Sequence, residues 1–101
     1  MPKGYVVFTE AIKDPAGMAA YGRVAAESLA ESGGRVIAVD LQPEVLEGEW
    51  HGHQTVVLEF ESVEAARAWY ESAAYEKAKP LRHAAADTNA VIVSGFAPRQ
   101  A

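Results

Sequence analysis

The sequence predicts an α+β domain whose elements follow the order strand, helix, strand, strand, helix, strand. Stretches rich in β-branched and aromatic residues alternate with stretches whose apolar residues recur at three- and four-residue spacing. Residues that start and end helices stand between the two kinds of stretch. The chain has 101 residues, the length of one domain, and half of them are hydrophobic, as expected for a globular protein with a modest core.

The first half of the chain supplies a strand, a long helix and a second strand. Residues 5–11 are rich in valine and aromatic residues and predict the first strand. Asp14 and Pro15 predict a helix start, because the aspartate side chain accepts hydrogen bonds from free amides and proline has no amide to leave unpaired. Gly33 and the glycine after it predict the helix end. Residues 35–41 predict the second strand.

Residues 54–60 predict the third strand, and their alternation separates two faces. One set is wholly apolar and is expected to face the helices: Val56, Leu58 and Phe60. The other set contains the carboxylate of Glu59 and is expected to face away from the helices. The strand therefore predicts a sheet with one dry face and one wetter face.

The last third of the chain supplies the second helical segment and the fourth strand. Ser62 predicts a helix over residues 63–71, since a serine side chain accepts hydrogen bonds from the first free amides. Ser72 predicts a second short helix to about residue 79, which Pro80 breaks or kinks. Two segments complete the pattern: a turn over residues 87–89 and a strand over residues 90–96.

This element order predicts the ferredoxin-like βαββαβ fold, in which both helices cover one face of a four-stranded antiparallel sheet. Val57 and other apolar residues point to the opposite face, and a bare apolar face of that size is unusual for a monomer. A second copy related by a two-fold axis covers such a face. We therefore expect a homodimeric α+β barrel, with one domain over residues 1–97 and a loose tail over residues 98–101.

Composition excludes several classes of partner. The formal net charge of −5 argues against nucleic acid, because phosphate groups require a basic face. Without cysteine the chain has no disulfide, thiolate nucleophile or cysteine-based zinc site. No apolar run approaches the roughly 20 residues that span a bilayer, and the N-terminal stretch does not resemble a signal peptide. We therefore expect no membrane partner and a cytoplasmic location.

Residues 43–53 form the long connection between the second and third strands. The connection is too long for a tight hairpin, yet it contains Val45, Leu46 and Trp50, so it is not simply a solvated loop. Long connections of this kind are often functional or interfacial. We expect a bent, partly extended excursion that lies on another surface.

The pattern of motifs along nearly the whole chain resembles the DUF1330 family, uncharacterised small proteins grouped with the dimeric α+β barrels. The most specific run, EFES…A…WY.S..Y..A.PLR, spans Glu59 to Arg82. The other matching pieces are Gly4-Tyr5, Asp14-Pro15, Gly33-Gly34, Glu47-Gly48 with Trp50, and Gly95. The resemblance implies the barrel-like dimer but no reaction, because the family has no settled activity. Its wider superfamily includes cofactor-free monooxygenases, isomerases, dechlorinases and haem-degrading enzymes, an analogy that assigns no chemistry.

Glu59 and Arg82 are the candidate catalytic residues. Glu59 is expected on the face away from the helices, and Arg82 follows the break at Pro80, from which it can turn back towards the same end. A carboxylate whose pKa is raised by desolvation acts as a general base. An arginine can hold a carboxylate or an enolate at two points. Structural ion pairs for both residues remain the alternative.

Three further residues are candidates for ligand binding. Tyr75 lies beside the break that presents Arg82, and a place in the core is its alternative. Trp50 either walls a pocket or anchors a dimer. His53 is the third candidate, at the end of the long connection. Two aromatic residues are expected in the core instead: Tyr21 and Trp69.

His51 and His53 flank a glycine and point to the same side of an extended chain, which is the geometry of a two-histidine metal site. A third ligand would have to come from Glu49 or His83, and nothing in the spacing requires either. The family pattern contains no histidine pair at this place. We therefore expect no metal, and a role for both histidines at the surface or at a dimer edge.

Two functions are compatible with these residues. The first is a small-molecule enzyme without a tightly bound cofactor, which uses Glu59 as acid or base and Arg82 as the anchor of a small acidic or aromatic metabolite. The second is a non-catalytic dimeric module that binds such a metabolite or serves as an accessory protein. The pH dependence of stability separates a desolvated Glu59, which destabilises the fold as pH rises, from an ion-paired Glu59, which destabilises it as pH falls.

Overall fold

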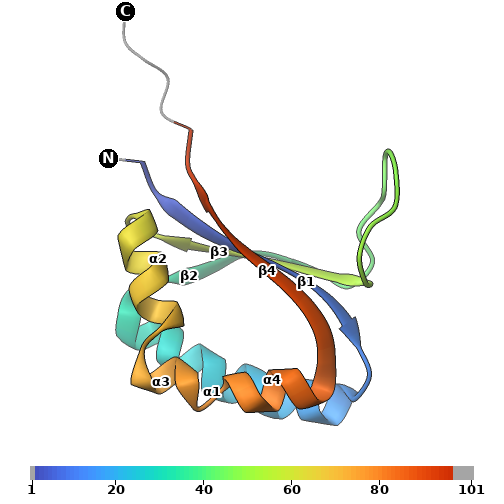
Figure 1. The fold of residues 1–101 in the computed structure, drawn as a ribbon, viewed down its shortest axis with the longest axis horizontal. Helices are drawn as coiled ribbons and strands as arrows, with labels where there is room; N and C mark the ends of the chain where they lie inside the picture. Colours follow the sequence, from blue (N-terminus) through green and yellow to red (C-terminus); the bar gives the residue numbers. More distant parts are fainter. Residues whose placement is uncertain (1, 97–101) are drawn as a thin grey trace, which may run out of the picture.

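Four strands form one antiparallel sheet, and the helices cover one of its faces (Figure 1). The computed structural model describes residues 2–96. Its elements are β1 (Gly4–Ile12), α1 (Pro15–Ser32), β2 (Arg35–Asp40), β3 (Gln54–Phe60), α2 (Val63–Tyr70), α3 (Ala73–Glu76), α4 (Lys79–Ala85) and β4 (Ala86–Ser94). The predicted tail over residues 98–101 lies outside the described residues.

The strand order is β2-β3-β1-β4, and every neighbouring pair is antiparallel. In this register Val6 of β1 lies between Leu58 of β3 and Ile92 of β4, so the three side chains share the face beneath the helices. The neighbouring pair in the same register, Tyr5 and Glu59, lies on the opposite face of the sheet. The ferredoxin-like fold and the predicted division of β3 into two faces are both confirmed.

Local signals set the bounds of α1. The Asp14 side chain accepts a hydrogen bond from the amide of Gly17 at 3.1 Å, and Pro15 occupies the first turn. At the other end Gly33 has φ 73°, a left-handed conformation that glycine adopts without steric cost. The predicted helix is therefore confirmed at both ends.

Two predictions in the last third of the chain are wrong. Pro80 does not break a helix but lies in the first turn of α4, where its missing amide has no helical partner to lose. The predicted turn over residues 87–89 belongs to β4, which pairs Asp87, Thr88 and Asn89 with consecutive residues of β1. The ladder hydrogen bonds to β1 outweigh the turn preference of these polar residues.

The core under the helices centres on Trp69, which is 1% exposed. Its ring lies 4.1 Å from the Tyr75 ring and 5.4 Å from the Phe60 ring, between centroids. The indole nitrogen donates a hydrogen bond to the Ser28 hydroxyl at 3.0 Å, which satisfies two buried polar groups of α1 and α2 together. The place of Trp69 in the core is thus confirmed.

The helix-free face of the sheet retains large exposed apolar side chains. Val91 and Val93 of β4 are 54% and 43% exposed. Residues 41–53 form neither helix nor strand, and they project from the sheet on the side away from the helices (Figure 1). Leu46 in this excursion is 86% exposed.

Within residues 2–96 no helix is both long enough and apolar enough to cross a membrane. The cytoplasmic location stays a prediction.

Candidate functional site

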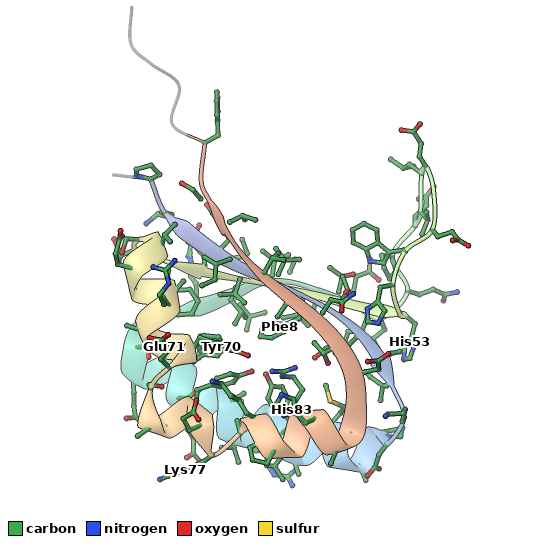
Figure 2. All side chains as sticks on the ribbon, in the orientation of Figure 1. Phe8, His53, Tyr70, Glu71, Lys77 and His83 are labelled. Carbon is green, nitrogen blue, oxygen red and sulfur yellow. The ribbon has the colours of Figure 1, made fainter. Side chains whose placement is uncertain are left out.

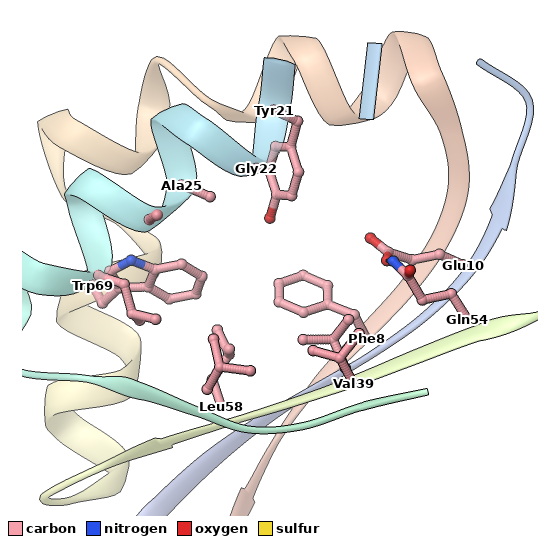
Figure 3. Close-up of a pocket in the computed structure, with 13 residues that line it drawn as sticks. Phe8, Glu10, Tyr21, Gly22, Ala25, Val39, Gln54, Leu58 and Trp69 are labelled. Carbon is pink, nitrogen blue, oxygen red and sulfur yellow. The ribbon is translucent and has the colours of Figure 1, made fainter. Parts of the chain in front are cut away.

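A cavity of about 220 Å³ lies between α1 and the sheet. Most of its lining is apolar and aromatic, and it includes Phe8, Leu29, Val56, Leu58 and Trp69. Three polar side chains interrupt this lining: Glu10, Tyr21 and Gln54. Figure 3 shows the Tyr21 hydroxyl pointing down towards Phe8, with Trp69 on one side and the Glu10–Gln54 pair on the other. Figure 2 shows Phe8 in the layer between the sheet and the helices.

The mouth of this cavity lies beside β2. Val36 and Val39 line the cavity and are nevertheless 51% and 57% exposed, so they stand between its interior and solvent. Gly22 of α1 lies on the other side of the mouth and adds no side chain to narrow it. A small molecule can therefore reach the interior between α1 and the edge strand.

Glu10 is a buried carboxylate at the end of the apolar row of β1. It follows Val6 and Phe8 at two-residue spacing and is 2% exposed. Its Oε1 accepts a hydrogen bond from Gln54 Nε2 at 2.6 Å, across the paired strands β1 and β3. Oε2 accepts no hydrogen bond from residues 2–96. If Oε2 were fully buried it would be an unsatisfied polar atom, but in that part of the chain the one such side-chain atom is Thr88 Oγ1. Oε2 is therefore not fully buried, and it borders open space.

Arg82 is a buried cation without a carboxylate partner among the described residues. It is 3% exposed, and its Nε donates a hydrogen bond to the Tyr75 hydroxyl at 3.3 Å. Its guanidinium carbon lies 5.2 Å from the centroid of the Phe8 ring, within range of a cation–π interaction. The Tyr75 hydroxyl in turn lies 2.7 Å from the Tyr21 hydroxyl.

Two hydrogen bonds join Arg82, Tyr75 and Tyr21. Arginine can only donate, so the Tyr75 oxygen accepts from Arg82. In the bond between Tyr75 and Tyr21 either hydroxyl can donate. Tyr21 also lines the cavity, so its hydroxyl is available to a ligand oxygen there. Among the described residues, the cavity lining thus presents the Tyr21 hydroxyl and the Glu10 carboxylate.

The electrostatics keep the Tyr21 hydroxyl protonated. Burial raises the pKa of Tyr21 well above its ordinary range, and the neighbouring Tyr75 and the negative charge of Glu10 raise it further. Burial also raises the pKa of Tyr75. Burial alone would lower the pKa of Arg82, but the adjacent hydroxyls of Tyr75 and Tyr21 outweigh it, and the net pKa is raised. At neutral pH the site therefore has a charged guanidinium behind two neutral phenols.

The structure does not bring Glu59 and Arg82 together, because the sheet separates them. Glu59 lies on the helix-free face, where its Oε1 accepts from Arg35 Nη2 at 2.7 Å and Arg35 Nε at 2.8 Å. Its Oε2 accepts from the Tyr5 hydroxyl at 3.1 Å. The hydrogen bond from Arg35 lowers the pKa of Glu59. Glu59 thus matches the structural ion-pair alternative.

The candidate binding residues divide between the two sides of the sheet. Tyr75 lies beneath the helices, 0% exposed, and joins Arg82 to Tyr21. Trp50 is half-exposed in the excursion, and its indole nitrogen donates to the Thr55 hydroxyl at 2.9 Å. Trp50 therefore lies on the opposite side of the sheet from the cavity.

The two histidines fasten the excursion to the sheet. His51 Nδ1 forms a hydrogen bond with Thr9 Oγ1 at 2.9 Å, and its Nε2 lies 3.7 Å from the Asp87 carboxylate. The backbone amide of His53 donates to the Glu10 carbonyl at 2.9 Å. Figure 2 shows His53 at this end of the sheet. The described residues contain no group of three or more histidine, aspartate or glutamate side chains that could hold a metal ion.

Sequence reasoning missed Glu10 and Gln54 as site residues. The signal was present: Val6, Phe8 and Glu10 share one face of β1 by simple alternation, so a carboxylate follows two core residues on the helix side. The same argument, applied to β3, placed Glu59 correctly on the other face. Tyr21 was expected in the core, and the structure adds that its hydroxyl opens onto the cavity.

Fold and site together define a small ferredoxin-like protein with an apolar cavity between its long helix and its sheet. Residues 3–96 match the family described as a domain of unknown function, DUF1330. The chain belongs to this family. No curated protein matches the sequence.

Several solved structures share the fold. A protein of unknown function from Rhodopseudomonas palustris has a TM-score of 0.75 at 21% identity, covering 96% of this chain and 85% of its own. SnoaB, a cofactor-independent oxygenase from Streptomyces nogalater, has a TM-score of 0.68 at 14% identity and covers 100% and 97%. A dimeric ferredoxin-like protein of unknown function from Thermobifida fusca has a TM-score of 0.62 at 11% identity and covers 92% and 91%. At these identities the likeness establishes the fold.

Proposed function

We propose that this protein is a small-molecule enzyme that needs no tightly bound cofactor and in which Glu10 transfers the proton. One observation carries the proposal: a buried carboxylate with an unpaired oxygen borders an otherwise apolar cavity that also contains the Tyr21 hydroxyl. Carboxylates in such surroundings are common general acids and bases. We therefore assign the role of acid or base to Glu10 instead of Glu59. Arg82 and Tyr75 remain part of the proposed site, since they are hydrogen-bonded behind Tyr21.

The proposed reaction is a proton transfer that relocates a hydrogen within the ligand. Glu10 Oε2 takes a proton from a carbon or hydroxyl next to an oxygen function of the ligand. The electron pair left behind moves towards the ligand oxygen, which accepts a hydrogen bond from Tyr21. Arg82 stabilises this negative charge through Tyr75, since preorganised donors and charges act strongly where water is excluded. Glu10 then returns the proton at a different atom, so the net change is a tautomerisation.

The fold itself is compatible with such chemistry, because a cofactor-independent oxygenase shares it. The mostly apolar lining lowers the local dielectric and strengthens the interaction of each charge with the developing oxyanion. These two points support an enzyme over the alternative of a non-catalytic binding module.

We also propose that the protein is a homodimer in which the helix-free faces of two sheets pack together. The exposed Val91 and Val93 support this, as does the excursion on the same side of the sheet. A solved structure with the same fold is described as dimeric. The cavity lies on the other face, so each copy has its own site.

Proton exchange tests the enzyme proposal without a known substrate. The protein is incubated in D₂O with a panel of β-diketones, cyclic enols and hydroxylated rings, and NMR follows the loss of carbon-bound hydrogen. We expect at least one compound to exchange faster with the wild type, and we expect Glu10→Gln to slow that exchange by about 10²–10⁴-fold. Glu59→Gln is the matched control, because it changes the same residue type on the neighbouring strand and the opposite face.

Two results decide between enzyme and binding module. Exchange that depends on Glu10 and not on Glu59 supports catalysis. A compound that binds in the cavity without any exchange, or with exchange unchanged in Glu10→Gln, contradicts it and supports the non-catalytic module.

A further inference from the structure

The volume of the cavity indicates how much of a ligand fits inside it. An apolar cavity of about 150 Å³ holds benzene, and pockets for drug-sized molecules begin at about 300 Å³. At about 220 Å³ the cavity lies between these limits and fits one six-membered ring with small substituents. The aromatic walls, Phe8 and Trp69, favour a flat ring, because ring faces and edges pack well against one another.

The polar groups set the substituents. Tyr21 presents its hydroxyl to the cavity and therefore pairs with an oxygen function on the ligand. Glu10 presents the unpaired Oε2 and therefore requires a donor, which on a small ring is a hydroxyl. Both groups line the same cavity, and Figure 3 shows both of them beside Phe8. The matching ligand therefore has one oxygen function for each of them.

The charges decide between a neutral ligand and an acidic one. Arg82 lies behind Tyr75, to which it donates from Nε, and it is not part of the cavity lining. Among the described residues, Glu10 is the one carboxylate that lines the cavity, and no lysine or arginine lines it. A ligand carboxylate would meet this negative charge in a medium of low dielectric, where like charges repel strongly.

We infer that the cavity binds a neutral single-ring compound with two oxygen functions, at least one of them a hydroxyl. Catechol is one such compound, and cyclic enol ketones are of the same class. The inference rests on the proposed function, because it names the substrate class of the same cavity. Of the small acidic or aromatic metabolites that the sequence allows, it selects the neutral kind.

The fluorescence of Trp69 can report ligand binding directly, because Trp69 lines the cavity. The chain has two tryptophans, so Trp50→Phe leaves Trp69 in the cavity wall as the sole indole. In this background, kept under nitrogen, the Trp69 fluorescence is titrated with catechol, phenol, toluene and benzoate. We expect catechol to bind at least about tenfold more tightly than toluene, since it gains two hydrogen bonds and one of them is to a charged group. We expect phenol between them and benzoate weakest.

Variants assign this preference to the two polar groups. Glu10→Gln and Tyr21→Phe are each expected to weaken catechol binding by about tenfold while leaving toluene unchanged. Glu59→Gln, on the other face of the sheet, is expected to change neither. A thermal melt of each variant confirms that it is folded, and two independent substitutions keep the test valid if one of them is not.

The outcomes separate this inference from the proposed function. Catechol binding no tighter than toluene, or benzoate binding tightest, overturns the ligand class, even if Glu10-dependent exchange is found with another compound. Catechol binding that depends on Glu10 and Tyr21 supports the class, even if no compound exchanges protons, a result that would remove the catalytic role alone.

Discussion

Glu10 and Glu59 lie on neighbouring strands of one sheet, and the two faces of that sheet give them opposite roles. Glu59 has both oxygens paired, with Arg35 and Tyr5, on a face without helices. Glu10 lies beneath the helices and against a cavity, and within residues 2–96 only one of its oxygens has a hydrogen-bond partner. A carboxylate that is fully paired at a surface stabilises structure at most modestly. One that is buried and half-paired is a candidate for binding a ligand.

The largest expected effect concerns the core that walls the cavity. Trp69→Ala removes the indole that packs on Phe60 and Tyr75, and we expect it to lower the free energy of unfolding by about 3–5 kcal/mol. Urea denaturation followed by circular dichroism measures this loss. Trp50→Ala, on the helix-free side, is the matched control and should cost about 1 kcal/mol or less. Equal losses for the two tryptophans would contradict the proposed division between faces.

The next effect tests the proposed dimer. Val93→Asp places a charge on the helix-free face, where the dimer interface is expected to bury it without a partner. We expect the dimer dissociation constant to rise at least about hundredfold in sedimentation equilibrium, which corresponds to about 2.7 kcal/mol. Leu81→Asp, at an exposed position of α4 on the helix side, should leave association unchanged. A wild type that sediments as a monomer would refute the proposed homodimer.

A smaller effect concerns the hydrogen-bond chain behind the cavity. Tyr75→Phe leaves the Arg82 Nε–H and the Tyr21 hydroxyl without their partner, and we expect a loss of about 1–3 kcal/mol in the free energy of unfolding. Thermal and urea unfolding measure it. Tyr70→Phe, which keeps the ring beneath the Lys79 ammonium, is the control and should have little effect. A loss no larger for Tyr75 than for Tyr70 would show that the chain adds nothing to stability.

The smallest expected effect is the pH dependence that Glu59 contributes. Its folded pKa is lowered, chiefly by the hydrogen bond from Arg35, below the unfolded value of about 4.3. The stabilisation is therefore fully present above the unfolded value and is lost as pH falls through the folded pKa. Arg35→Ala should flatten this acid limb in a series of melts between neutral pH and the acid transition. Stability that falls as pH rises through this range would indicate a desolvated Glu59 instead.

Local sequence patterns were sufficient wherever neighbouring residues decide the conformation. Asp14, Pro15 and Gly33 set the bounds of α1, because a helix end needs partners for amides and carbonyls only a few residues away. The alternation in residues 54–60 assigned both faces of β3, because side chains of a strand point to opposite faces in turn. From the order of such elements the ferredoxin-like fold followed.

Tertiary structure decided what depends on residues distant in sequence. Residues 87–89 belong to β4 because they pair with β1. Pro80 lies in the first turn of α4 and does not end α3. The hydroxyls of Tyr21 and Tyr75 meet across 54 positions, and Glu10 meets Gln54 across 44. Periodicity predicts the face to which each of these side chains points, but packing alone selects its partner there. The sequence by itself therefore determined the elements and their faces, and the packed fold determined the site.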